Sequence, residues 1–233
     1  MIGKGKSISH GVAALEYDLA KEINGQAVAT EIARHELYGC TGAEMVQEMK
    51  PYHIDFPNVK NNCLRFEVSP SIEESATFTD ADWAELGNDF MQRMGLANHQ
   101  YIIIRHSGTE SKKEQAHLHI LANRVSLSGE LYRDNWIGKK ATEAANAIAK
   151  ERNFVQSQDI GKVNKAEIKE AMDGVLKQMQ GFDFTKFKEE LGKRGFKVRE
   201  ARASTGKLNG YYVTARSGTE YKASEIGTVS YTH

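Results

Sequence analysis

The chain of 233 residues is poor in cysteine and has no long apolar run. Its two cysteines, Cys40 and Cys63, are too few for a disulfide scaffold and fit a reducing compartment. No stretch approaches the roughly 18 consecutive apolar residues of a membrane helix. Residues 1–23 also lack the unbroken apolar core of a signal peptide. We therefore expect a cytoplasmic protein with no membrane partner.

The chain also lacks a net charge, since 31 Lys and Arg oppose 31 Asp and Glu. Residues 1–132, however, carry 12 basic and 18 acidic side chains, a net charge of −6, whereas residues 133–233 carry 19 and 13, a net charge of +6. Eight basic residues fall between positions 193 and 222: Lys193, Arg194, Lys197, Arg199, Arg202, Lys207, Arg216 and Lys222. Such a patch can attract a polyanion, because salt screens acidic groups beyond roughly 8–10 Å. The alternative is an unevenly charged surface without a partner.

Local patterns predict both helices and strands. Helices are expected at residues 10–23, 41–50, 77–95, 133–152, 164–180 and 183–194, and strands at 63–71, 100–106, 117–125, 195–204, 210–218 and 219–224. Because strands and helices do not alternate regularly, we expect an α+β fold, with a central antiparallel sheet of about five strands flanked by helices. One domain over residues 1–233 is favoured, with residues 164–233 as its basic helical and hairpin portion, since the polar linker at 155–163 is short.

Three of the eight histidines fall within the stretch RHSGTESKKEQAHLHILANRV, residues 105–125. Strand alternation places His117, His119 and Asn123 on one face of the second strand. Two imidazoles at positions i and i+2 can bind one ion, and His106 at the end of the adjacent strand could complete a three-histidine site with open positions. The alternative is that these histidines are ordinary side chains of a half-buried strand and bind no metal. A three-histidine zinc hydrolase is one function that this pattern allows.

The segment HSGTE…AHLHILANRV resembles the metal-binding motif of the relaxases, the MobA-type mobilisation endonucleases of the HUH superfamily. KGKSISHGVAALEYDLA is similar to the first motif of that family, in which a tyrosine on an early helix is the nucleophile. LRFEVSPS and TDADWAELGNDFMQRMGLANHQYIIIRH resemble its middle region, and FKEELGKRGFKV…GTEYKASEIG resembles its carboxy-terminal part. The resemblance covers nearly the whole chain and implies an HUH-endonuclease-like fold.

The resemblance implies roles for individual residues. Tyr17 would be the nucleophile, with Tyr38 and Tyr52 as less favoured alternatives. The metal ligands would be His106, His117 and His119. Ser69 would lie near the DNA, and Asn123 would support the ligands or the strand itself.

The resemblance also implies weaker contacts with DNA, and the sequence departs from the family pattern at two points. We expect these contacts from Lys4, Lys6, Arg124 and the eight basic residues of segment 193–222. Gly108 stands where the family often has an aspartate, and the loop between His106 and His117 is longer than usual. Asp18 or Glu110 would have to replace that aspartate.

The implied activity is metal-dependent nicking of one DNA strand, with the 5′ phosphate kept as an ester on tyrosine and a 3′ hydroxyl released. The substrate would be a single-stranded origin of transfer. Relaxosome accessory proteins and a coupling protein would be partners in mobilising a plasmid or a transposable element. Magnesium or manganese is the expected metal, although three imidazoles would also suit zinc or copper.

Three other functions stay open. A rolling-circle replication initiator would share the chemistry but act on a replication origin. A zinc hydrolase would need neither Tyr17 nor the basic segment. A non-catalytic DNA-binding accessory protein would bind DNA without cutting it. Because the chain stops at VSYTH, we expect either the N-terminal catalytic part of a longer protein or a small natural form.

Overall fold

The computed structural model describes residues 1–108, 115–204, 206 and 208–227. The chain divides into two compact units, Met1–Ser157 and Gln158–His233. This division falls inside the linker predicted at residues 155–163. That both units act as one domain stays a prediction. Among the residues described, no helix is long and apolar enough to cross a membrane.

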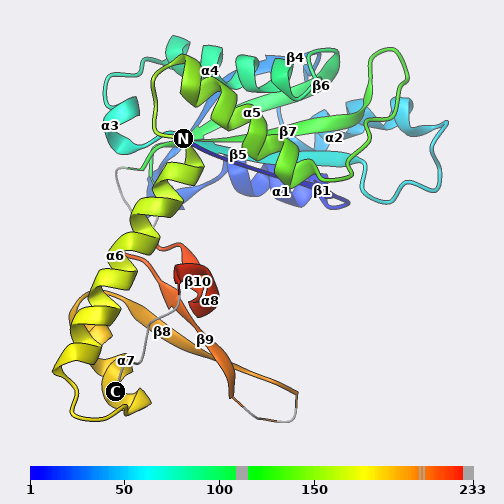
Figure 1. Ribbon diagram of the computed structural model, residues 1–233. Helices are drawn as coiled ribbons and strands as arrows, with labels where there is room; N and C mark the ends of the chain where they lie inside the picture. Colours follow the sequence, from blue (N-terminus) through cyan, green and yellow to red (C-terminus); the bar gives the residue numbers. More distant parts are fainter. Residues whose placement is uncertain (109–114, 205, 207, 228–233) are drawn as a thin grey trace. The chain divides into compact units, whose positions relative to one another are not determined.

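The first unit is built on a five-stranded antiparallel sheet with the strand order β1-β5-β7-β6-β4 (Figure 1). Its elements in chain order are β1 (Ile2–Ile8), α1 (Gly11–Leu19), β2 (Glu22–Ile23), β3 (Gln26–Ala27), β4 (Ala29–His35), α2 (Gly42–Met49), the 3-10 turn η1 (Lys50–His53), β5 (Cys63–Ser69), α3 (Ile72–Ser75), α4 (Asp80–Arg93), β6 (His99–His106), β7 (His117–Ser126) and α5 (Ile137–Glu151). The predicted α+β class, with a five-stranded antiparallel sheet flanked by helices, is confirmed.

Helices cover both faces of this sheet (Figure 1). On one face, α4 and α5 pack through a core that includes Phe90 and Ala145. On the other face, α1 and α2 pack through a smaller core that includes Leu15 and Met45. The alternation predicted for β7 is confirmed, because Leu118, Ile120 and Ala122 belong to the first core and Leu121 to the second. His117, His119 and Asn123 therefore face the side of α1 and α2.

Two strands of the sheet, β1 and β4, are not predicted by the sequence patterns. β1 reads IGKGKSI, in which glycine and lysine hide the alternation that marks a strand. Its glycines allow α5 to approach closely, because a Cβ on Gly3 would lie 2.6 Å from the Cβ of Ala145 and a Cβ on Gly5 would lie 3.2 Å from the Cβ of Ala141. In β4 a bulge between Glu31 and Ala33 interrupts the regular pairing with β6. Both strands are thus specified by tertiary packing more than by local pattern.

The predicted helix-end signals are observed in α4. The N-cap hydroxyl of Thr79 accepts from the backbone N–H of Asp82, and the Asp82 carboxylate accepts from the Thr79 N–H, a reciprocal capping box. Gly95 follows the helix at φ +72°, a conformation that glycine adopts without strain. α4 is therefore specified locally, and its apolar stripe then fixes it on the sheet.

The second unit packs helices on a separate sheet with the strand order β10-β9-β8. The elements beyond α5 are α6 (Ser157–Gln178), α7 (Phe184–Lys193), β8 (Lys197–Arg202), β9 (Leu208–Thr214), β10 (Glu220–Lys222) and α8 (Ala223–Ile226). The predicted hairpin and the short strand after it are observed as β8, β9 and β10. The predicted linker is wrong from Ser157 onward, because α6 already begins there. Asn164 lies in the buried face of this helix and donates to Ser217 Oγ and Tyr221 Oη, both at 3.0 Å.

Candidate functional site

Three histidines meet where β6 ends and β7 begins. The antiparallel register pairs His106 with His117, and His119 lies two residues further along the same face of β7. The ring centroid of His106 lies 4.4 Å from that of His119 and 5.4 Å from that of His117. One nitrogen from each ring can be chosen so that all three lie within 4.8 Å of one another. The three predicted ligands are thus brought together in a group that could hold a metal ion.

Hydrogen bonds orient two of these rings. His117 donates from Nδ1 to the carbonyl oxygen of Gln115 at 3.0 Å, and His106 donates from Nε2 to the carbonyl oxygen of Asp18 at 2.7 Å. The remaining nitrogens, His117 Nε2 and His106 Nδ1, therefore keep their lone pairs. His117 Nε2 lies 3.1 Å from His119 Nε2. Two nitrogens bound about 2.1 Å from one ion at roughly a right angle would be about 3 Å apart, so this donor set fits a metal.

The surroundings of the cluster favour the neutral form of two of its rings, His106 and His119. Burial, with the nearby His106, His117, Arg65 and Lys4, lowers the pKa of His119 from 6.5 to about 2. Burial also lowers the pKa of His106. A neutral imidazole is the form that binds a metal, so His106 and His119 are in the binding state at neutral pH.

Asp18 is buried beside the cluster, although most aspartates lie at protein surfaces. Its carboxylate accepts from Arg65 Nε at 3.0 Å and from Arg65 Nη2, and its Oδ1 lies 3.8 Å from His119 Nδ1. Burial raises the pKa of the Asp18 carboxyl, and the Arg65 guanidinium opposes that rise. Of the two residues expected to replace the missing aspartate, Asp18 lies at the cluster. The other, Glu110, lies outside the described residues.

Tyr17 precedes Asp18 in the last turn of α1, which the hydrogen bond from His106 fixes to the cluster. The Tyr17 side chain is 54% exposed, and its phenol oxygen accepts from Lys21 Nζ at 2.6 Å. Tyr38 lies beyond the opposite end of β4 and donates to Glu36 at 3.1 Å. Tyr17 therefore lies on the side of the histidine cluster, whereas Tyr38 lies at the far end of β4.

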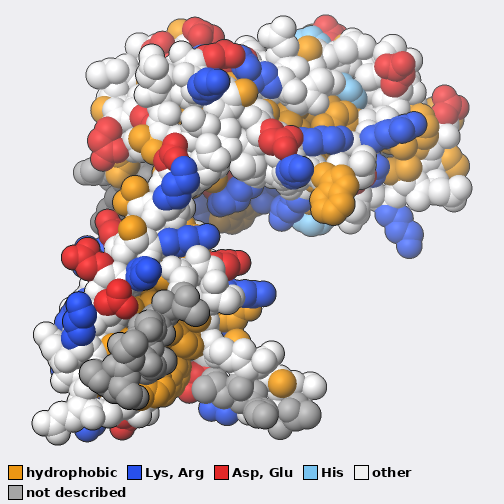
Figure 2. Space-filling view, viewed as in Figure 1, with side chains coloured by type: hydrophobic (Ala, Val, Ile, Leu, Met, Phe, Trp, Pro, Cys, Tyr) orange, Lys and Arg blue, Asp and Glu red, His pale blue; other side chains and the backbone are white. Residues whose placement is uncertain are grey.

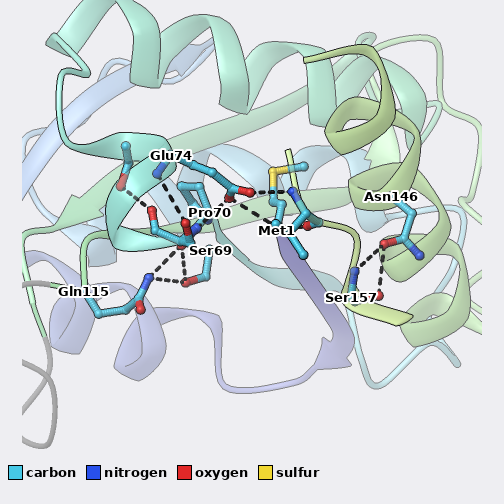
Figure 3. A network of polar contacts seen from close by, with 10 residues as sticks. Met1, Ser69, Pro70, Glu74, Gln115, Asn146 and Ser157 are labelled. Carbon is cyan, nitrogen blue, oxygen red and sulfur yellow. Dashed lines mark hydrogen bonds and ion pairs between the residues drawn. The ribbon is translucent and has the colours of Figure 1, made fainter. Parts of the chain in front are cut away.

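Ser69 ends β5 and lies beside Gln115 (Figure 3). Gln115 donates from Nε2 to the Ser69 hydroxyl at 3.3 Å and to the Pro70 carbonyl oxygen at 2.6 Å, while its own carbonyl accepts from His117. Glu74, in the neighbouring α3, forms an ion pair with the amino group of Met1, whose nitrogen lies 3.6 Å from Glu74 Oε2. Ser69 thus supports the segment that positions His117.

Asn123 belongs to a different polar network and does not bond to the three histidines. It is fully buried, and its Oδ1 accepts from His53 Nε2 at 2.7 Å and from the N–H of Val125 at 3.0 Å. Its Nδ2 donates to Gln100 Oε1 at 3.0 Å and to the carbonyl oxygen of Met49 at 3.4 Å. Of the two roles expected for Asn123, the structural one matches this geometry. The other candidate nucleophile, Tyr52, precedes His53 in η1 on this side of the sheet.

Lys4 and Lys6 line a hollow of about 230 Å³ beside the cluster, together with Arg65, Glu67 and His119. Strand register explains this, because Lys4 pairs with Glu67 across β1 and β5, and Glu67 pairs with His119 across β5 and β7. Lys4 Nζ lies 2.9 Å from Glu67 Oε1, so its charge is partly neutralised. Both N-terminal lysines nevertheless line the hollow beside the cluster, where a polyanion could contact them.

Arg124 is not placed for such a contact. Its side chain is 13% exposed and donates to Asp134 Oδ1 at 2.7 Å and to the carbonyl oxygens of Asn61 and Tyr132. It therefore fixes the loop after β7, and the sequence could not reveal this because the partner carboxylate belongs to an irregular segment.

The basic segment 193–222 lies in the second unit, and its charge is partly neutralised there. Arg199 makes a two-pronged ion pair with Glu220, Arg202 pairs with Glu200, and Lys193 pairs with Glu190. Arg194 and Arg216 donate to backbone carbonyl oxygens. Lys197 and Lys222 are exposed, and Lys207 lies outside the described residues.

Sequence reasoning did not find Lys21, Arg65 and Gln115. Lys21 follows Tyr17 by four residues. Residues at this spacing on a helix are neighbours, so the sequence did contain a signal for a cation beside Tyr17. Arg65 and Gln115 reach the cluster through strand pairing and a loop contact, and neither is visible before the register of β5 against β7 is known.

A family model described as "Relaxase: MobA/VirD2-like, nuclease domain" matches residues 17–154. That segment holds Tyr17 and the three histidines, covers more than half of the chain and lies within the first unit. It does not reach the carboxy-terminal stretch for which the sequence suggested a resemblance, so that part of the resemblance stays a prediction.

Among solved structures, the chain is similar to the conjugative relaxase TrwC in complex with oriT DNA. The metal-bound structure is 11% identical with a TM-score of 0.36, and the metal-free structure is 10% identical with a TM-score of 0.40. Each match covers 89% of this chain and 74% of the other. No curated protein matches the chain.

Proposed function

The chain belongs to the MobA/VirD2-like relaxases and has their nuclease domain, and from this premise we propose that Tyr17 nicks one DNA strand beside the histidine cluster. The observation that supports the proposal most is the meeting of three imidazoles with the helix turn that presents an exposed tyrosine. The proposed substrate is the unpaired strand of an origin of transfer, and the proposed role is to start the mobilisation of a plasmid or transposable element in the cytoplasm.

The proposed reaction is a transesterification at one phosphodiester. The Tyr17 oxygen attacks phosphorus, the new O–P bond forms as the bond from phosphorus to the 3′ oxygen breaks, and the leaving 3′ oxygen takes up a proton. The phenol loses its proton to solvent, which reaches the half-exposed side chain. Lys21 donates to this oxygen and would stabilise the negative charge that develops there. The ester on Tyr17 keeps the energy of the phosphodiester, so the strand can be rejoined.

The metal proposed for this site is magnesium or manganese, with zinc as an alternative. His106, His117 and His119 would hold it, and when bound it would stabilise the negative charge on the phosphoryl oxygens. Gln115 and the Asp18 carbonyl orient two of the rings, and the Asp18 carboxylate with Arg65 surrounds Nδ1 of the third.

The hollow lined by Lys4, Lys6 and Arg65 would receive the phosphates next to the reacting one. Phosphate contacts of this kind position a strand without reading its sequence. The basic residues of the second unit stay candidates for further DNA contacts. Accessory proteins of the relaxosome and a coupling protein are the proposed protein partners.

The test is to incubate the protein with Mn²⁺ and single-stranded oligonucleotides tiled across the DNA beside its gene. We expect a covalent protein–DNA band on a denaturing gel, with the adduct on the peptide that contains Tyr17. Tyr17→Phe should abolish the band, whereas the matched variant Tyr38→Phe should retain it.

Other outcomes would change the conclusion in different ways. An adduct on another tyrosine would overturn the assignment of the nucleophile. Tight binding of DNA without any adduct would favour a non-catalytic accessory protein. Neither binding nor adduct would point to a metal hydrolase of another substrate.

A further inference from the structure

We propose that the indole ring of Trp136 is a stacking platform for an unpaired DNA base, at the edge of the sheet behind the hollow of Lys4 and Lys6. The inference rests on the proposed function, because it requires a single-stranded DNA substrate. It assigns a binding role to a residue outside the histidine cluster and outside the basic segment of the second unit.

Trp136 combines exposure with an unfavourable backbone conformation. Its side chain is 77% exposed, whereas Trp83 is 2% exposed in the core. Trp136 has φ 58° and ψ 26° and occupies the third position of a turn closed by the N–H of Ile137 on the carbonyl oxygen of Asp134 at 3.1 Å. Glycine or asparagine usually fills such a position, because a bulky side chain is strained at positive φ. A mostly exposed ring gains little from burial to offset that strain, so its presence points to function.

The turn that presents this ring is held from both sides. Arg124 donates to Asp134 Oδ1 at 2.7 Å and to the Tyr132 carbonyl oxygen at 3.1 Å, which ties the turn to β7. Lys140 donates to the carbonyl oxygen of Arg133 at 2.7 Å, which ties it to the first turn of α5. The backbone that carries the ring is thus held in place before any ligand arrives, which lowers the conformational entropy lost on binding.

The charge around the ring favours a polyanion. Trp136 lines a hollow of about 300 Å³ with Lys139, Lys140 and Glu143. Figure 2 shows exposed hydrophobic surface near the start of α5 with Lys and Arg side chains beside it. A flat apolar group linked to phosphates matches an exposed indole among lysines, and single-stranded DNA supplies that combination. Lys139 Nζ lies 3.8 Å from Glu143 Oε1, whereas Lys140 donates to a neutral carbonyl oxygen, so Lys140 carries most of the positive charge beside the ring.

The edge strand β1 connects this platform to the candidate active site. Gly138 lies against β1, since a Cβ on it would be 3.5 Å from the carbonyl oxygen of Gly5. Gly5 is flanked in sequence by Lys4 and Lys6, which line the hollow beside His119. β1 is the outermost strand on this side of the sheet. A DNA strand that leaves the hollow around β1 would therefore meet the Trp136 ring.

The experiment uses the full chain with Tyr17→Phe, which binds DNA without cutting it. Because the protein has two tryptophans and Trp83 is buried, tryptophan fluorescence reports mainly on solvent access to Trp136. We expect an unlabelled single-stranded oligothymidylate to quench this emission, and a duplex to quench it far less. Trp136→Ala should weaken binding of the single strand by about tenfold or more, and Trp136→Phe should retain most of the affinity.

Two controls separate stacking from other effects. Tyr38→Ala removes a ring that is 76% exposed but lies beside Glu36, and it should leave affinity for the single strand unchanged. Trp136→Gly should unfold at the same or a higher temperature than the parent, because glycine accepts the positive φ. A clearly lower melting temperature would mean that the ring supports the fold, and would overturn the proposal.

Two further results would contradict the stacking role of Trp136, and they differ in what they imply for the nicking function. If the single strand binds while Trp136 emission is unchanged and Trp136→Ala binds like its parent, the platform is wrong and the nicking function is unaffected. If the single strand does not bind and the covalent adduct is also absent with intact Tyr17, the proposed function is wrong and the platform is wrong with it.

Discussion

Two polar clusters lie on the same face of β7, four residues apart, and they differ in how their polar atoms are satisfied. Around Asn123, each amide atom has two hydrogen-bond partners. Around His119, ring nitrogens of three histidines converge, and two of them lie 3.1 Å apart. The first arrangement joins the amide to four partners, whereas the second gathers one nitrogen from each of three histidines within 4.8 Å of one another, as a metal site requires.

The difference between these clusters shows what separates a structural polar network from a candidate metal site. Both are mostly buried and both contain histidine, so burial and residue type do not distinguish them. What distinguishes them is that three imidazoles converge at His119, whereas a single imidazole contacts the Asn123 side-chain amide. Changes at the histidine cluster should therefore affect activity more than stability, and changes at Asn123 should do the reverse.

The largest expected effect is that of His119→Gln on activity. We expect formation of the Tyr17–DNA adduct to slow by about a hundredfold to a thousandfold, because the metal that stabilises charge on the phosphate would be lost. The melting temperature should change little. Adduct formation with Mn²⁺ and thermal melting on one preparation measure both quantities, and adduct formation at the rate of the unaltered chain would remove the distinction between the clusters.

Asn123→Ala should produce the opposite result. Loss of a fully buried amide with four hydrogen bonds should lower the free energy of unfolding by about 2–3 kcal/mol, because several buried polar groups lose a partner. Mn²⁺ binding to the folded protein should be retained. Urea unfolding together with a Mn²⁺ titration tests this, and an equally stable variant that no longer binds metal would reverse the roles of the two clusters.

The pH dependence of the metal-free protein should also depend on the histidine cluster. His119 has a pKa of about 2 when folded and an ordinary value of 6.5, so below pH 6.5 the unfolded chain binds a proton that the folded chain does not. Its contribution to stability is complete above pH 6.5 and is lost as the pH falls, by at most about 1.4 kcal/mol per pH unit. His119→Gln should flatten this slope. Parallel curves of unfolding free energy against pH for the two proteins would contradict the expectation.

A smaller effect is expected from Lys21, which lies at the margin of the cluster. Lys21→Gln should slow adduct formation by a factor of about three to ten, because one exposed charged hydrogen bond to the Tyr17 oxygen is lost. Lys21→Arg should restore part of the rate. Measured rates for both variants at saturating DNA test this, and a Lys21→Gln rate equal to that of the unaltered chain would remove Lys21 from the mechanism.

Much of the first unit could be predicted from local sequence. The pairing of β6 with β7 and the face that holds His117 and His119 follow from strand alternation, and the start of α4 follows from its capping residues. β1 and β4 could not be predicted, because glycine, lysine and a bulge remove the alternation that marks a strand. The resemblance to relaxases proposed Tyr17 and the three histidines, and the register then placed those histidines together.

The remaining part of the site depends on partners that are distant in sequence. Arg65 reaches Asp18 only because β5 pairs with β7 on the face covered by α1. Arg124 has an apparently free charge in the sequence and an ion pair with Asp134 in the fold. Asn123 follows the histidine motif closely, and its network with His53 and Gln100 becomes visible only when η1 and β6 are placed beside β7.

The most direct test of the account is an anomalous difference map from crystals of the protein grown with Mn²⁺. We expect one strong peak bounded by nitrogens of His106, His117 and His119, within reach of the Tyr17 side chain. A map with manganese bound elsewhere and no peak among these three histidines would contradict the assignment of the metal site.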